Sequence, residues 1–267
     1  MASVTHAIRA LDELLRGDRT RSADLRVGLA NIPLRIFIPV AIVLGCTYGL
    51  FMGWYAIAAP ALPNVPGRTA ADPWLQLIAS TVKLPALFVF TLIVTFPSLY
   101  VFNALVGARL RFIPTLRLLI AAVVINLAVG ASLGPILGFF TVSTSSYAFM
   151  IVLNAALLGI AGMVGLWFLL QTLRRLTQVA VLDSADEAAA EAGAPPIEGE
   201  ARAEKVTTAN TIFSIWVIIY ALVGAQMGWL LRPFIGHPNL PFEWIRGTRE
   251  GNFFSSVAFH LRQLLGM

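Results

Sequence analysis

Long apolar runs alternate with short polar segments along most of the chain. Five runs suit membrane-spanning helices, because a span needs roughly 20 apolar residues at about 1.5 Å per residue. The runs cover residues 36–59, 74–106, 116–137, 147–170 and 211–231. Four of them match a single crossing. The second is too long for one straight crossing and too short for two.

Both ends of the chain carry a helical period that is too short to cross a membrane. In residues 3–17 the apolar side chains fall on one side of a helix, with Ser3 as an N-cap and Gly17 as a stop. Residues 253–265 repeat the pattern, beginning at Phe253 and Phe254. We expect two amphipathic surface helices, although packing of the first against its own protein is at least as good an interpretation.

The composition fits an integral membrane protein. Of 267 residues, 12% are charged and 58% are hydrophobic, whereas an ordinary soluble domain is about 25% charged. This balance excludes a soluble enzyme, a disulfide-stapled secreted domain and a disordered tail protein. Cys46 is the single cysteine, so no intramolecular disulfide can form. The predicted fold is an all-α polytopic membrane bundle with about five transmembrane helices plus N- and C-terminal amphipathic surface helices.

The chain divides by composition into five parts. They are a cytoplasmic amphipathic helix and basic segment (1–35), a four-span membrane bundle (36–171), an acidic cytoplasmic linker (172–209), the fifth span (210–231) and an aromatic C-terminal cap with an amphipathic helix (232–267). The linker places its carboxylates among many alanines, and Pro195 and Pro196 interrupt it. We therefore expect a flexible segment with some helical tendency rather than a folded domain.

Basic residues predict the orientation. With five spans and the N-terminus inside, thirteen Arg and Lys residues flank the cytoplasmic ends and six flank the outer ends. Four of those six lie in the tail, and a re-entrant second run or an extra crossing near it would put the tail inside. Only Lys83 and Lys205 are lysines, an Arg preference typical of GC-rich bacterial genomes. We expect a bacterial inner-membrane protein with a cytoplasmic N-terminus and a periplasmic C-terminus.

Three spans carry glycines at four-residue spacing, which places them on one face of each helix. Small faces let membrane helices approach closely, since lipid supplies no hydrophobic drive for association. We expect these faces to pack within the chain. The residues are Gly45, Gly49, Gly53, Gly130, Gly134, Gly138, Gly224 and Gly228.

Lys83 is the most unusual single residue. Asp72 and Pro73 predict a helix start, which places Lys83 about 15 Å along the axis. If Trp74 marks the interface, Lys83 lies near mid-membrane and faces a partner or a water-filled cavity. In the other interpretation residues 73–82 lie in the outer interface and Lys83 marks the membrane edge. The second is favoured, because a lysine near a helix end snorkels at low cost.

The tail after residue 231 is dense in Pro, Gly and aromatic residues, which predicts an ordered, turn-rich path. Aromatics beside Arg and Glu are typical of protein interfaces. A partner surface is therefore predicted there, and a lid packed on the protein's own helix ends is the alternative. The residues of the predicted surface are Arg232, Phe234, His237, Phe242, Trp244, Arg246, Arg249, Phe253 and Phe254.

The stretch G-A-R-L-R-F-I-P-T-L-R-L-L, residues 107–119, joins the second and third runs. With its flanking runs it resembles bacterial members of the Yip1-type polytopic family, over about half the chain. The resemblance implies five spans, a cytoplasmic N-terminus and a short outer C-terminus. The long tail departs from that pattern, and no functional residue carries over.

No catalytic motif is present, and the three histidines are dispersed. We expect no enzyme activity, cofactor or metal, and no nucleic-acid partner. The sequence favours a structural or scaffolding subunit of a membrane complex, in contact with the lipid bilayer and with other membrane or periplasmic chains or copies of itself. The alternative is a pore or permease component that uses the glycine-lined helices and Lys83.

Overall fold

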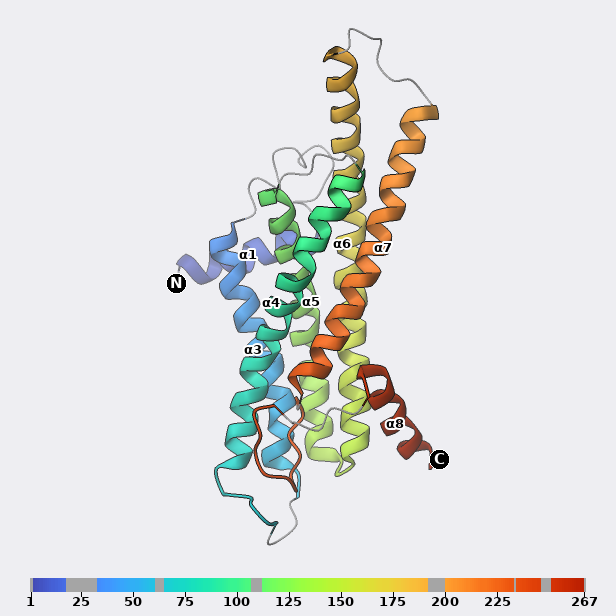
Figure 1. Ribbon diagram of the computed structural model, residues 1–267. Helices are drawn as coiled ribbons and strands as arrows, with labels where there is room; N and C mark the ends of the chain where they lie inside the picture. Colours follow the sequence, from blue (N-terminus) through green and yellow to red (C-terminus); the bar gives the residue numbers. More distant parts are fainter. Residues whose placement is uncertain are drawn as a thin grey trace. The chain divides into compact units, whose positions relative to one another are not determined.

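The computed structural model describes residues 2–17, 33–60, 65–106, 112–191, 200–232, 234–245 and 251–266. These ranges form seven helices and contain no strand, so the predicted all-helical class is confirmed. The helices are α1 (Ala2–Leu15), α3 (Leu34–Ala58), α4 (Asp72–Val106), α5 (Phe112–Ser143), α6 (Tyr147–Glu191), α7 (Glu200–Leu231) and α8 (Phe253–Leu265), drawn in Figure 1.

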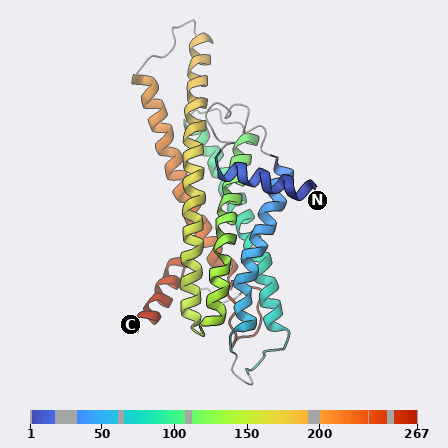
Figure 2. The same ribbon diagram turned by 180° about the vertical axis from the view of Figure 1, so that it is seen from behind.

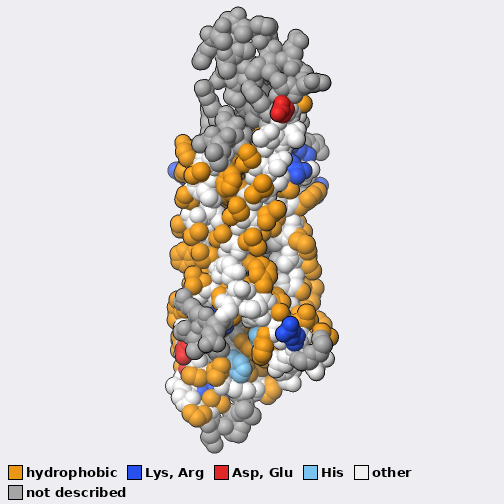
Figure 3. Space-filling view, turned by 45° about the vertical axis from the view of Figure 1, so that its right-hand side comes forward, with side chains coloured by type: hydrophobic (Ala, Val, Ile, Leu, Met, Phe, Trp, Pro, Cys, Tyr) orange, Lys and Arg blue, Asp and Glu red, His pale blue; other side chains and the backbone are white. Residues whose placement is uncertain are grey.

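Helices α3 to α7 are each long and apolar enough to cross a membrane. Their candidate spans are Leu34–Ala58, Asp72–Phe102, Phe112–Ser143, Tyr147–Leu176 and Val206–Leu231. Hydrophobic side chains, orange in Figure 3, cover much of the described surface on the face shown there. This is the architecture of a multi-pass membrane protein, because side chains that face lipid need not be polar.

Three local expectations are corrected. The long second run is one continuous helix of 35 residues, α4, which passes through Pro85. Helix α6 continues to Glu191 and α7 begins at Glu200, so much of the predicted linker is helical. Alanine-rich sequence with scattered carboxylates favours helix over coil. Helix α1 begins at Ala2, so Ser3 lies inside the helix and is not its N-cap.

The chain forms two compact units, and α3 to α7 each contribute segments to both. Unit 1 comprises Met1–Ile38, Leu92–Ile125 and Gly165–Ala221. Its core includes Trp216, which is fully buried and donates its indole N–H to Ser98 Oγ at 3.0 Å. In α1, Ala10 and Leu14 are buried. The N-terminal amphipathic helix therefore packs against its own protein, as the alternative interpretation held.

Unit 2 comprises Pro39–Thr91, Asn126–Val164 and Leu222–Met267. In it the glycine face of α3 lies directly on the backbone of α4. A Cβ placed on Gly49 would lie 2.7 Å from Thr81 Cα, and one on Gly53 would lie 2.7 Å from Leu77 Cα. A Cβ on Gly45 would meet Pro85 Cβ at 3.2 Å. These glycines let the two backbones touch, which lipid-embedded helices use for association.

The other predicted glycines lie against side chains of unit 2 rather than against a backbone. Gly134 and Gly138 flank the ring of Phe51, where added Cβ atoms would lie 2.5 and 2.8 Å from ring carbons. The remaining three leave at least 3.6 Å to the nearest atom, which is ordinary contact. They are Gly130 beside Ala161 and Tyr48, Gly224 beside Thr91, and Gly228 beside Leu87.

The α3–α4 contact predicts different outcomes for the same substitution at two glycines. Gly49→Ala forces the new methyl onto backbone atoms that cannot move aside, and overpacking of this kind lowers the free energy of unfolding by about 1–3 kcal/mol. The matched control is Gly159→Ala, because a Cβ on Gly159 of α6 meets nothing within 4 Å. Thermal unfolding in mild detergent, followed by circular dichroism, compares them. Equal midpoints for the two variants would contradict the close approach.

Candidate functional site

Four polar side chains form a buried stripe along the first half of α4. Asp72, Gln76, Ser80 and Lys83 are separated by three or four residues, so they share one helix face. Their exposed fractions are 5%, 5%, 1% and 2%. Polar groups buried in an apolar helix cost free energy unless they are hydrogen-bonded. The stripe therefore needs polar partners.

The partners come from residues 234–245, here called the docked segment, which runs beside α4 (Figure 1). Gln76 Nε2 donates to the carbonyls of His237 and Leu240 at 3.4 and 3.3 Å. The N–H of Phe242 donates to Asp72 Oδ2 at 3.2 Å. In each of these bonds, a stripe side chain meets the main chain of the segment.

Two further main-chain contacts extend the same pattern at both ends of the segment. Ser80 Oγ donates to the carbonyl of Phe234. Lys83 Nζ donates to the carbonyl of Trp244. An irregular backbone beside apolar helices must find hydrogen-bond partners in the protein. The stripe supplies such partners to five backbone groups of the docked segment, which fixes its path.

Gly236 is the point of closest approach. A Cβ there would overlap Gln76 Oε1 and would lie 2.5 Å from Ala56 Cβ on α3. Only a residue without a side chain lets the segment enter between these two helices. The next residues turn back on themselves, because the N–H of Leu240 donates to the carbonyl of His237 at 3.3 Å. The N–H of Asn239 donates to His237 Nδ1 at 3.1 Å.

Lys83 is buried against another part of its own chain. Its side chain is 2% exposed and ends on the Trp244 carbonyl, with Nζ 5.5 Å from the centre of the Trp244 ring. A carbonyl dipole and an aromatic face both stabilise an ammonium group. The lysine therefore faces a polar partner within the protein. That partner lies 161 residues further along the chain.

Helix α6 holds the other side of the docked segment. Tyr147 Oη donates to the carbonyl of Ile235 at 3.2 Å, and its ring centre lies 4.5 Å from that of His237. Tyr55 of α3 lies 6.1 Å from Tyr147, ring to ring, and donates its hydroxyl to the carbonyl of Ser145 at 3.0 Å. The segment is thus hydrogen-bonded to helices of unit 2 on two sides.

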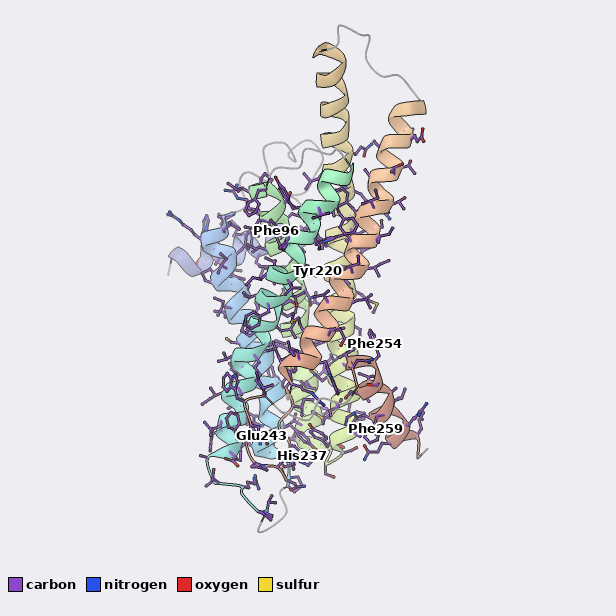
Figure 4. All side chains as sticks on the ribbon, in the orientation of Figure 1. Phe96, Tyr220, His237, Glu243, Phe254 and Phe259 are labelled. Carbon is purple, nitrogen blue, oxygen red and sulfur yellow. The ribbon has the colours of Figure 1, made fainter. Side chains whose placement is uncertain are left out.

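The predicted surface residues divide between the docked segment and its flanks. Phe234, His237, Phe242 and Trp244 belong to the segment, and His237 is labelled in Figure 4. Arg232 precedes it, with its guanidinium 3.5 Å from the centre of the Trp229 ring. Phe253 and Phe254 lie in α8. Arg246 and Arg249 lie outside the described residues.

The segment is packed on its own helices, which is the lid arrangement that the sequence left as the alternative to a partner surface. Sequence reasoning missed Asp72, Gln76 and Ser80 as members of one site with Lys83. Their spacing was a usable signal, since a polar stripe within an apolar helix predicts a polar partner. Tyr55 and Tyr147 carried no such signal, because single tyrosines at span ends are common interfacial residues.

These features define an α-helical, multi-pass membrane protein whose C-terminal segment closes over a polar face of its own helix α4. Among the described residues, no group of three or more His, Cys, Asp or Glu side chains is placed to hold a metal ion. Comparison with protein-family models, with curated proteins and with solved structures found no match.

Gly236 provides a direct test of the docking. Gly236→Ala forces a methyl group against Gln76 and Ala56, at a cost of about 1–3 kcal/mol, so chymotrypsin should cut within residues 234–245 roughly tenfold faster. Mass spectrometry of timed digests measures the rate. Leu240→Ala is the control, because it shortens an exposed side chain and leaves the carbonyl that Gln76 contacts. Unchanged cleavage of the Gly236→Ala variant would refute the close fit.

Proposed function

We propose that the chain is a non-catalytic structural subunit of a complex in the bacterial inner membrane. The observation that carries the proposal is the closure of the polar face of α4 by the chain's own C-terminal segment. Lys83 and Gln76 donate hydrogen bonds to backbone carbonyls of that segment. Polar side chains that are hydrogen-bonded within the chain favour a structural role over a role in binding or conducting a solute.

A pore or permease component has less support. That alternative relied on glycine-lined helices and on Lys83. Gly49 and Gly53 are instead covered by the α4 backbone, and Gly134 and Gly138 by Phe51. A transport site would be expected to keep its charged residue open to a cavity or a substrate pathway, whereas Lys83 is covered by Trp244.

The outer side of the docked segment is the surface that we assign to a partner chain. Leu240, Trp244 and Ile245 are 39%, 49% and 42% exposed, and Glu243 beside them is exposed as well (Figure 4). The backbone beneath them is held by hydrogen bonds to α4. A partner that binds there loses little entropy in ordering the loop, because the loop is already fixed. Partly exposed Trp with neighbouring apolar residues is typical of binding hot spots.

One substitution distinguishes loss of partner binding from loss of the folded structure. Ile245→Asp should release the chain from its assembly, because it places a charge at the centre of the apolar contact, and it should leave thermal aggregation unchanged. Native gels of digitonin-solubilised membranes report the size of the assembly.

Two further variants serve as a control and as a comparison for Ile245→Asp. Ile8→Asp, at an exposed apolar position on α1, is the matched control and should keep the assembly. A chain that stops after Leu231 should lose both the assembly and thermal stability, because it uncovers the stripe on α4. An Ile245→Asp variant that stays in the full-size assembly would disprove the partner surface.

The proposed orientation has the N-terminus in the cytoplasm and the docked segment on the periplasmic side of the membrane protein. In unit 2 the segment contacts the start of α4 through Asp72 and the start of α6 through Tyr147. In the five-span arrangement both helix starts lie on the side opposite the N-terminus. The continuity of α4 supports this orientation over the re-entrant path that would put the tail inside. The basic residues of the tail are outnumbered by those of the predicted cytoplasmic segments.

Cysteine labelling tests the orientation. In a Cys46→Ser background, a membrane-impermeant maleimide added to intact spheroplasts should modify Ser143→Cys and spare Glu204→Cys. Both positions are exposed, so a difference reports the side of the membrane rather than burial. Permeabilisation should make the two positions equally reactive. Labelling of Glu204→Cys in intact spheroplasts would reverse the assignment.

A further inference from the structure

We infer that α8 is an interfacial helix, with one apolar side embedded in the bilayer at the boundary between headgroups and acyl chains. The occupant of that side is lipid, not a second protein. The inference is independent of the partner surface on the docked segment. It rests on how α8 is capped, on what its three sides face and on the level at which it meets α6.

Helix α8 is capped at both ends by residues adjacent to it in the chain. Asn252 Oδ1 accepts the N–H of Ser255 at 2.9 Å, and Ser255 Oγ accepts the N–H of Asn252 at 2.8 Å, which forms a capping box. At the other end Gly266 adopts a left-handed φ of 71° and its N–H bonds to the carbonyl of Arg262. With both ends satisfied, α8 needs no partner to define its limits.

None of the described residues of α8 is buried, yet its three sides differ in character. Phe253, Val257 and His260 are half-buried and face the protein. A second side carries Phe254, Leu261 and Leu265, which are 52%, 45% and 62% exposed and are spaced by seven and four residues. We call these three residues the apolar stripe.

The third side is mainly polar. Ser255, Arg262 and Gln263 are exposed there, together with Phe259 (Figure 4). A helix with protein on one side, an apolar stripe on the next and a polar side beyond is typical of the membrane boundary. Arg262 is the only charged side chain in α8. Contact with lipid would therefore depend on apolar burial more than on charge.

The level of α8 relative to a span comes from its contact with α6. The rings of His260 and Tyr147 lie 6.2 Å apart, and Tyr147 is the first residue of the candidate span Tyr147–Leu176. Figure 2 shows α8 beside the start of α6, consistent with that contact. The middle of α8 thus lies where α6 enters the membrane. Its 13 residues extend about 20 Å, too short to cross a core of about 30 Å.

The neighbouring surface of the same unit also exposes apolar side chains. The outward side chains Phe139 and Val142 at the end of α5, and Met163 on α6, are 63%, 71% and 64% exposed. In a multi-pass membrane protein such side chains meet acyl chains. The apolar stripe would meet the same lipid at the membrane boundary, so no separate protein partner is needed to cover it.

Depth-resolved fluorescence of the full-length protein tests the inference. In the Cys46→Ser background, Leu261→Cys and Leu265→Cys are labelled with an NBD fluorophore and reconstituted into phosphatidylcholine–phosphatidylglycerol vesicles. Phospholipids with a doxyl group near the headgroup end should quench both probes several-fold more than a probe at Arg262→Cys, the matched control on the polar side. Aqueous iodide should show the reverse order.

Three other outcomes of the quenching experiment would each overturn the proposal. Equal iodide quenching at Leu261→Cys and Arg262→Cys would place the stripe in water. Protection of Leu261→Cys from both quenchers, with efficient bismaleimide cross-linking between copies, would assign the stripe to a second copy of the chain. Protection from both without cross-linking would place it against the rest of its own chain. Native thermal unfolding of each labelled variant confirms that the fold is retained.

Discussion

A backbone that leaves helical structure beside apolar helices must have its polar groups hydrogen-bonded by the protein, and unit 2 is arranged around that constraint. Residues 234–245 have no helical hydrogen bonds of their own. Asp72, Gln76 and Lys83 on α4 supply partners to this main chain, and Tyr147 on α6 supplies another. The stripe and the segment thus hydrogen-bond to each other, although Gln76 Oε1 is buried without a hydrogen-bond partner. Neither would be stable in an apolar surrounding alone.

Helix α4 serves two adjacent surfaces of unit 2. On one, Leu77, Thr81 and Pro85 receive the glycine face of α3. On the other, the polar stripe continues into Leu87 and Thr91, which contact Gly228 and Gly224 of α7. The end of α7 and then the docked segment therefore occupy consecutive parts of one α4 face.

The features that suggest transport in the sequence act as structural contacts in the fold. A lysine in a span and glycines in rows are also found along substrate paths. Here the lysine ends on the Trp244 carbonyl and the α3 glycines admit a neighbouring backbone. Exposed apolar side chains of the described residues include those on the spans, on the outer side of the docked segment and on α8. Those surfaces suit lipid and protein partners, which accords with a structural role.

Local periodicity was enough to locate the five spans and the two terminal helices, but not every helix end. The start of α6 at Tyr147, the end of α7 at Leu231 and the bounds of α8 all follow from hydrophobic spacing and caps, which depend on residues within a few positions of each other. Tertiary structure alone decided what covers Lys83. Its partner is a main-chain carbonyl 161 residues away, and carbonyls are the same in every residue, so no side chain in the sequence marks it. The same holds for Gly236, whose need for a missing side chain arises only where Gln76 and Ala56 close around it.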